Sequence, residues 1–219
     1  MHQTIIDLLK TADQDALALG GIGRPNLTFG GLIAQAEATV AALNSRGIGR
    51  NDRVAIVLPN GPEMASAFLS VGCGATTAPL NPAYREEELN FYLSDLDAKA
   101  LLVEYGSTTP ARNVAKARNI PVLEIDWAEE DPAGTFRILG DLSAAAQVNG
   151  GFTSPDDVPL VLHTQKSSPS TPRKPDKHRG STSCLPARTL RPPALGRKPP
   201  VFRENVLMEK TSLFHPSLR

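Results

Sequence analysis

The sequence contains few of the residues that cross-link or anchor a chain. It has only two cysteines, Cys73 and Cys184, in 219 residues, which excludes a disulfide framework and a Cys/His zinc site. Cys73 lies in the apolar stretch Val71–Ala75, which predicts a buried structural thiol. No apolar run approaches the roughly 18 residues that a membrane span requires. Residues Met1–Lys10 lack the basic and apolar regions of a signal peptide, so we expect a soluble, cytoplasmic protein.

The chain also has no net charge, with 23 basic and 23 acidic residues. This balance hides two unlike parts. Residues 1–164 contain 11 lysines and arginines against 20 aspartates and glutamates, whereas residues 165–219 contain 12 against 3. Such a change of sign along a chain indicates two kinds of polypeptide. The boundary at residue 164 therefore separates an amino-terminal domain from a basic tail.

Within residues 1–164, apolar residues at helical spacing alternate with short continuous apolar runs. The run Val54–Leu58 is typical of a strand that is covered on both faces, as in a parallel sheet. Alternating strands and helices predict βαβ units, so the expected fold class is α/β, a parallel sheet covered by helices. We expect residues 127–157 to form a loose connection with a short helix near Leu142–Gln147. The predicted helices are 4–19, 32–45, 62–71, 85–94 and 110–118, and the predicted extended segments are 26–29, 53–58, 75–79, 100–103, 121–125 and 158–163.

The tail, residues 165–219, differs in composition. Eight prolines fall within residues 165–200, among clustered serines, threonines and basic residues, and apolar residues are sparse. Proline is incompatible with helix interiors and central strands. Such a segment buries too little apolar surface to offset the entropy lost on folding, so we expect a disordered, low-complexity tail. Its charge allows only nonspecific attraction to nucleic acid or anionic lipid, since it has no recognition motif.

Several segments of the first 164 residues together resemble the AMP-forming acyl-CoA synthetases, which are adenylate-forming ligases. They are Leu27–Phe29, Gly49–Asn60, Ala78–Leu93 and Asp156–Thr164, the last being similar to the strand that leads into the family's ATP-binding loop. The amino-acid sequences of Ala78–Asn81 and Leu162–Thr164 are most similar to the oxalate–CoA ligase-like branch of this family. The resemblance covers about three quarters of the chain, as the amino-terminal part of such an enzyme.

The resemblance implies a ligase that uses ATP and Mg²⁺ to convert a small carboxylic acid to an acyl-adenylate, and then passes the acyl group to CoA. It also implies cofactor-binding roles for Thr164, as the first residue of the ATP-binding loop, and for His163 beside it. Glycines in this loop let the backbone approach the phosphates, while hydroxyls and a lysine bind them. No catalytic residue and no metal ligand is assigned within the chain.

After Thr164 the sequence departs from that loop. The family continues with Ser-Gly-Thr-Thr, whereas here Gln165–Lys174 contains no glycine, and Thr171–Lys174 echoes the end of the loop at the wrong spacing. We therefore expect a truncated, inactive ligase fragment, whose tail reflects a reading-frame shift, a mis-spliced gene model or a pseudogene. The alternative is a non-catalytic interaction module with a basic disordered tail. An exposed core face could also make the fragment self-associate.

Four features of the domain each have a structural and a functional interpretation. His163, which the resemblance places beside the phosphate loop, is a hydrogen-bonded structural residue or an acid or base. Glu86–Glu88 compensate a helix dipole or suggest a metal site, although consecutive residues cannot converge on one ion. Tyr84 and Tyr92 pack between helix and sheet or line a pocket. Gly20–Gly23 follows a predicted helix instead of a strand, so it is not a dinucleotide loop.

Overall fold

The computed structural model describes residues 4–140 and 149–163. The predicted helix 142–147, Thr164 and the tail lie outside these residues. Short apolar segments form a five-stranded sheet with the order β4-β3-β5-β6-β7. Three strand pairs of this sheet are parallel, and β7 alone runs antiparallel to its neighbour β6. The strands are β3 (Arg53–Val57), β4 (Thr76–Pro79), β5 (Ala100–Glu104), β6 (Val122–Asp126) and β7 (Arg137–Leu139).

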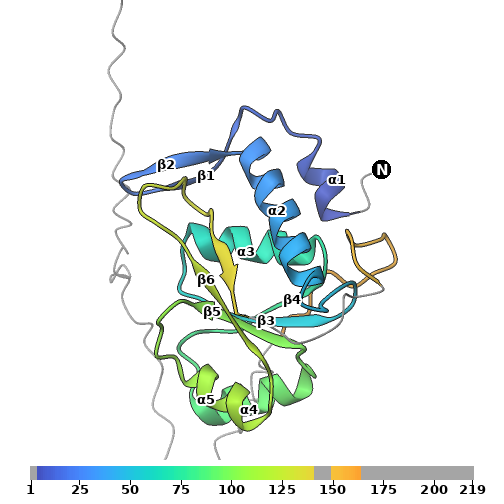
Figure 1. Ribbon diagram of the computed structural model, residues 1–219, viewed down its shortest axis with the longest axis vertical. Helices are drawn as coiled ribbons and strands as arrows, with labels where there is room; N and C mark the ends of the chain where they lie inside the picture. Colours follow the sequence, from blue (N-terminus) through green and yellow to red (C-terminus); the bar gives the residue numbers. More distant parts are fainter. Residues whose placement is uncertain (1–3, 141–148, 164–219) are drawn as a thin grey trace, which may run out of the picture. The chain divides into compact units, whose positions relative to one another are not determined.

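Helices cover both faces of the sheet (Figure 1). Alternate residues of β3 point to opposite faces: Val54 and Ile56 pack beneath α2 and α3, while Ala55 and Val57 pack beneath α4 and α5. This two-sided burial explains the continuous apolar run of β3 and confirms the predicted α/β class. The helices are α2 (Phe29–Asn44), α3 (Pro62–Gly72), α4 (Glu86–Asp95) and α5 (Pro110–Ala117). Within the described residues, every helix is too short or too polar to span a membrane.

The amino-terminal region differs from its prediction as one helix over residues 4–19. Helix α1 (Ile5–Leu9) is capped by Thr4 and ends early, and the chain then forms the antiparallel hairpin of β1 (Leu17–Gly21) and β2 (Arg24–Thr28). The physical reason is the Asp13 carboxylate, which accepts a hydrogen bond from the Asp15 amide (3.1 Å) and stabilises a turn that competes with the helix.

The glycines of this region correct a second expectation. Gly20 and Gly21 belong to strand β1, and Gly23 takes the left-handed conformation (φ 73°) in the hairpin turn. The glycines therefore lie at the end of a strand and in the turn after it, and do not follow a helix. The chain continues into another strand instead of a helix, so the segment still lacks the geometry of a dinucleotide loop.

The described parts of the predicted loose connection, residues 127–140 and 149–157, contain regular structure. They include β7, which extends the sheet at β6, and a segment around Thr153 that packs against the end of α3. The Gln35 side chain of α2 pairs with both backbone groups of Phe136, accepting from its N–H (3.3 Å) and donating to its carbonyl (3.0 Å). A buried amide on a helix thus fixes the approach to β7, which sequence periodicity does not reveal.

Candidate functional site

Residues 158–163, here called the approach segment, lie beside β4 at the edge of the sheet. Thr77 and Leu160 form an isolated parallel bridge, with the Thr77 N–H donating to the Pro159 carbonyl (2.9 Å) and the Val161 N–H to the Thr77 carbonyl (3.0 Å). The Thr76 hydroxyl donates to the Val158 carbonyl (2.6 Å). The segment was predicted as a strand and is only a bridge, because Pro159 has no N–H with which to extend the ladder.

The start of the approach segment is fixed by Asp157. Its carboxylate accepts hydrogen bonds from Arg50 Nε (2.6 Å), Asn51 Nδ2 (2.8 Å) and the Ser154 N–H (2.6 Å). These donors, led by the Arg50 guanidinium, lower the pKa of Asp157 to about 2. The same carboxylate raises the pKa of Arg50. Asp157 is therefore an ionised anchor between the turn before β3 and the approach segment.

The end of the approach segment places His163 against α4. Its Nε2 lies 2.9 Å from Asp95 Oδ2, and its ring centroid lies 4.8 Å from that of Tyr92. Thr164, the other predicted cofactor-binding residue, lies outside the described residues. His163 therefore contacts two side chains of α4, Asp95 and Tyr92. Its role in cofactor binding stays a prediction.

Tyr84 and Tyr92 pack between α4 and the sheet, as the structural interpretation predicted. Their rings stack at 5.0 Å, and Tyr92 is buried within the cluster beneath α4 and α5. Burial is the first cause that raises the pKa of Tyr84, followed by its contact with Tyr92. Tyr92 also contacts His163, a pairing that no sequence pattern indicated.

The remaining candidates have structural roles. Glu86–Glu88 form the first turn of α4, where Glu88 accepts the Arg85 N–H (2.9 Å) and caps the helix. No group of three or more potential metal ligands occurs within residues 4–140 and 149–163. Cys73 is fully buried, as predicted for a structural thiol, and burial raises its pKa to about 12.

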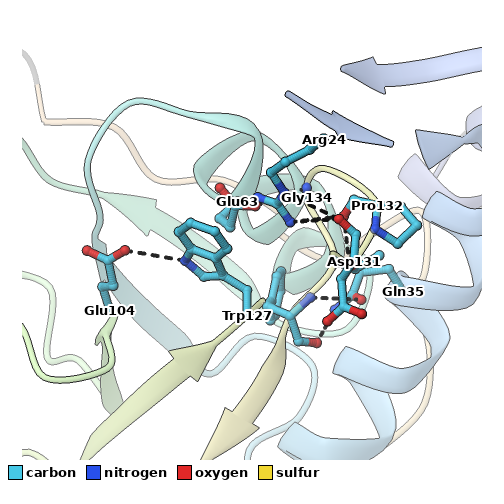
Figure 2. Close-up of polar contacts among 10 residues, drawn as sticks. Arg24, Gln35, Glu63, Glu104, Trp127, Asp131, Pro132 and Gly134 are labelled. Carbon is cyan, nitrogen blue, oxygen red and sulfur yellow. Dashed lines mark hydrogen bonds and ion pairs between the residues drawn. The ribbon is translucent and has the colours of Figure 1, made fainter. Parts of the chain in front are cut away.

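A polar cluster around Arg24, which no sequence pattern indicated, lies at the carboxyl end of the sheet (Figure 2). Arg24 pairs with Glu63 in the first turn of α3 and lies 4.4 Å from the Trp127 ring, which follows β6. The Trp127 indole N–H donates to Glu104 at the end of β5 (3.3 Å). Ligands of parallel α/β sheets usually bind at this edge. At the ends of β5 and β6, this edge holds the Arg24, Glu104 and Trp127 side chains.

The domain is therefore a helix-covered, mainly parallel sheet whose last described segment passes β4 and stops at α4. A family model described as "AMP-binding enzyme" matches residues 9–177. The chain belongs to this family. The match extends beyond residue 164, where sequence analysis placed the end of the resemblance, and includes the glycine-free segment up to Lys174.

Similar proteins agree with this assignment. The chain is 36% identical over 155 residues to an oxalate–CoA ligase of Arabidopsis thaliana, covering 68% of this chain and 30% of that protein. It is 34% identical over 173 residues to a probable CoA ligase, CCL9, of Humulus lupulus, covering 74% and 32%. Among solved structures, apo MatB from Rhodopseudomonas palustris has the same fold (TM-score 0.55, 20% identity, 77% of this chain and 34% of that chain).

These matches confirm the predicted resemblance to acyl-CoA ligases, including an oxalate–CoA ligase. The chain spans about a third of the length of these relatives. The shared third is the amino-terminal α/β domain described above.

Proposed function

We propose that residues 1–164 are the amino-terminal scaffold of an AMP-forming acid–CoA ligase, and that this chain by itself does not activate a carboxylic acid. The observation that carries the proposal is the approach segment. Two backbone hydrogen bonds with β4, one hydrogen bond from the Thr76 hydroxyl and the Asp157 anchor lead the chain to the edge of the sheet at α4. There the family's phosphate loop would begin, and this chain instead continues with Gln165–Lys174.

The chemistry of adenylation explains why this replacement matters. ATP phosphates need several N–H groups that converge on one cluster of oxygens, and glycine permits that close approach. After Thr164 the sequence has Gln165 and Lys166, which carry side chains where glycine has none, and Pro169, which lacks an N–H. The described residues also offer no cluster of carboxylates or histidines for Mg²⁺. The residues present do not fit ATP and Mg²⁺, and we derive no catalytic step for this chain.

The substrate class follows from the relatives only by analogy. Intact members of the family use ATP, Mg²⁺ and CoA to convert a small carboxylic acid to its CoA thioester. Two similar proteins, from Arabidopsis thaliana and Saccharomyces cerevisiae, are oxalate–CoA ligases, 36% and 34% identical to this chain. Oxalate is therefore the first acid to test, beside short monocarboxylic and aromatic acids.

The direct test is ATP–pyrophosphate exchange by the purified chain with this panel of acids. We expect no exchange above background and, at best, millimolar ATP affinity, roughly −4 kcal/mol. A full-length oxalate–CoA ligase serves as the positive control for the assay. Exchange with any acid would refute the proposal, as would micromolar ATP binding in calorimetry that Thr164→Ala abolishes.

The charge distribution favours the second candidate, a non-catalytic interaction module. Residues 165–219 contain twelve basic and three acidic residues. This net positive charge would attract anionic surfaces. Micromolar ATP binding would contradict both candidates, since it is expected only of a competent ligase fragment. Self-association is a further prediction, and the exposed Phe91 and Leu162 side chains are the apolar groups to examine. Sedimentation at increasing concentration would measure it.

The origin of residues 165–219 has its own test in the encoding nucleotide sequence. We expect another reading frame downstream of codon 164 to encode a Ser-Gly-Thr-Thr-like loop followed by family-like sequence. The reason is that the sequence departs from the family pattern inside a motif instead of at a domain boundary. Absence of such sequence in both other frames, after removal of any intron, would show that the frame-shift hypothesis is wrong.

A further inference from the structure

The end of the approach segment depends on a side chain instead of on the sheet. Among the described residues, its last backbone hydrogen bond runs from the Val161 N–H to Thr77. Leu162 is 59% exposed and provides little packing. Two residues beyond that bond, the His163 side chain is only 15% exposed, and it contacts Asp95 and Tyr92 of α4. These side-chain contacts thus attach the end of the segment to α4.

The geometry also selects one form of the imidazole. An ionised Asp95 carboxylate only accepts hydrogen bonds, so the neutral ring donates from Nε2 across the 2.9 Å contact. Nδ1 has no solvent contact and no hydrogen-bond partner among residues 4–140 and 149–163. A proton on Nδ1 would bury an N–H without an acceptor there, which is unfavourable. The Nε2–H tautomer therefore fits the site, and it fixes the direction of the ring.

We propose that His163 is a positioning residue that sets where the chain leaves the sheet toward the phosphate-loop position. Its Nε2–H bonds Asp95, its ring packs on Tyr92, and together these contacts fix the end of the approach segment on α4. The inference rests on the proposed function only in assigning the phosphate-loop position to the residues after His163. The two features that it predicts are the Nε2–H tautomer of His163 and the attachment of the end of the approach segment to α4. Both can be measured without nucleotide.

The first measurement is the ring tautomer of His163 in the full-length chain, by ¹⁵N correlation spectroscopy at about pH 8. The sequence has four histidines, and His163→Gln identifies the relevant signals. We expect a single Nε2–H tautomer in the wild-type chain and averaged ring nitrogens in Asp95→Ala. Asp97→Asn is the matched control, because Asp97 is an exposed carboxylate just after the same helix that contacts no histidine in the described part of the chain.

The second measurement is amide hydrogen exchange at Val161. His163→Ala should accelerate this exchange about threefold to tenfold, the range for a partly exposed hydrogen bond to a carboxylate. His163→Gln keeps a donor near the Nε2 position and should restore protection. The amides of Ala55 and Leu102 in the central strands should not change.

An Nδ1–H tautomer in the wild-type chain would overturn the proposal. So would unchanged Val161 exchange in Asp95→Ala, a variant that alters an exposed side chain and leaves the core intact. Equal exchange in His163→Ala and His163→Gln would also contradict it. These outcomes are independent of the ATP–pyrophosphate assay, so failure of the proposed function and failure of this inference are distinguishable.

Discussion

Arg24 of β2 and Glu63 of α3 form an ion pair whose side chains are only 9% and 13% exposed. Glu63 also accepts the Gly134 N–H (3.1 Å), and Arg24 donates to two backbone carbonyls of residues 131–132. The guanidinium lies 4.4 Å from the Trp127 ring. One buried pair therefore holds the hairpin, the first turn of α3 and the connection between β6 and β7 together (Figure 2).

Breaking this pair should destabilise the domain strongly. Arg24→Met leaves the Glu63 carboxylate buried without its cation, and we expect the free energy of unfolding to fall by about 3 kcal/mol. Urea unfolding followed by Trp127 fluorescence measures the change, because the chain has a single tryptophan. The double variant Arg24→Met/Glu63→Leu should lose less than the two single variants together, since the charges are removed as a pair.

The matched control is the exposed ion pair of Arg137 and Asp126. These side chains are 75% and 34% exposed and 3.2 Å apart. Arg137→Met should change stability by about 1 kcal/mol or less. If Arg24→Met were as mild as this control, the pair would not hold the connection in place.

The backbone conformation at position 134 and the atoms around it both require glycine. Gly134 has φ +88°, and a Cβ placed there would lie 3.0 Å from the Pro62 carbonyl and 2.9 Å from a Leu19 methyl group. We expect Gly134→Ala to destabilise the domain by about 2 kcal/mol. Gly23 isolates the conformational part, since it has φ +73° and nothing within 4 Å. Gly23→Ala should therefore have an effect of about 1 kcal/mol, and equal effects would show that packing at Gly134 is unimportant.

The helices and strands from β3 to β6 were predictable because apolar periodicity and burial agree there. Val54–Leu58 is apolar throughout because both faces of β3 are covered. The hairpin β1–β2 was not predictable in this way. Its strands are short, β1 contains two glycines and β2 a proline, and Leu27 is their single buried residue. Ile5, Leu8 and Leu9 gave a helical spacing, but the helix ends before the turn at Asp13.

The candidate site was predictable only in part for the same reason. A resemblance to known motifs pointed to His163, but its partner Asp95 lies 68 positions earlier in the sequence, and no local pattern joins them. The Arg24–Glu63 pair likewise depends on long-range contacts. The one clue in the sequence was Trp127, an isolated aromatic residue in a segment that otherwise looked like a loose connection.

Asp157 predicts a pH dependence of stability. Its pKa is lowered from 3.8 to about 2 in the folded protein, chiefly by Arg50. A lowered pKa stabilises the folded state fully above the pKa of the unfolded chain, and this stabilisation is lost as the pH falls through the folded value. Asp157→Asn should therefore lower the melting temperature at neutral pH, and its difference from the wild type should shrink between about pH 4 and pH 2.

The neighbouring exposed residue Asp156 offers the control for this experiment. Asp156→Asn should leave the melting temperature and its pH dependence close to those of the wild type, because Asp156 is exposed to solvent. A difference between Asp157→Asn and the wild type that stayed constant down to about pH 2 would contradict the role of the ionised carboxylate.

Cys73 should be unreactive in the folded protein. Burial among α1, α2 and α3 raises its pKa to about 12, so about one thiol in ten thousand is ionised near pH 8. Its carbonyl also accepts the Thr153 N–H (2.7 Å), which holds residues 149–153 over this region. In a Cys184→Ser chain, where Cys73 is the single cysteine, a thiol reagent should react only as fast as the domain opens. Reaction should become rapid and stoichiometric in denaturant, and rapid reaction in native buffer would show that the cluster around Cys73 opens readily.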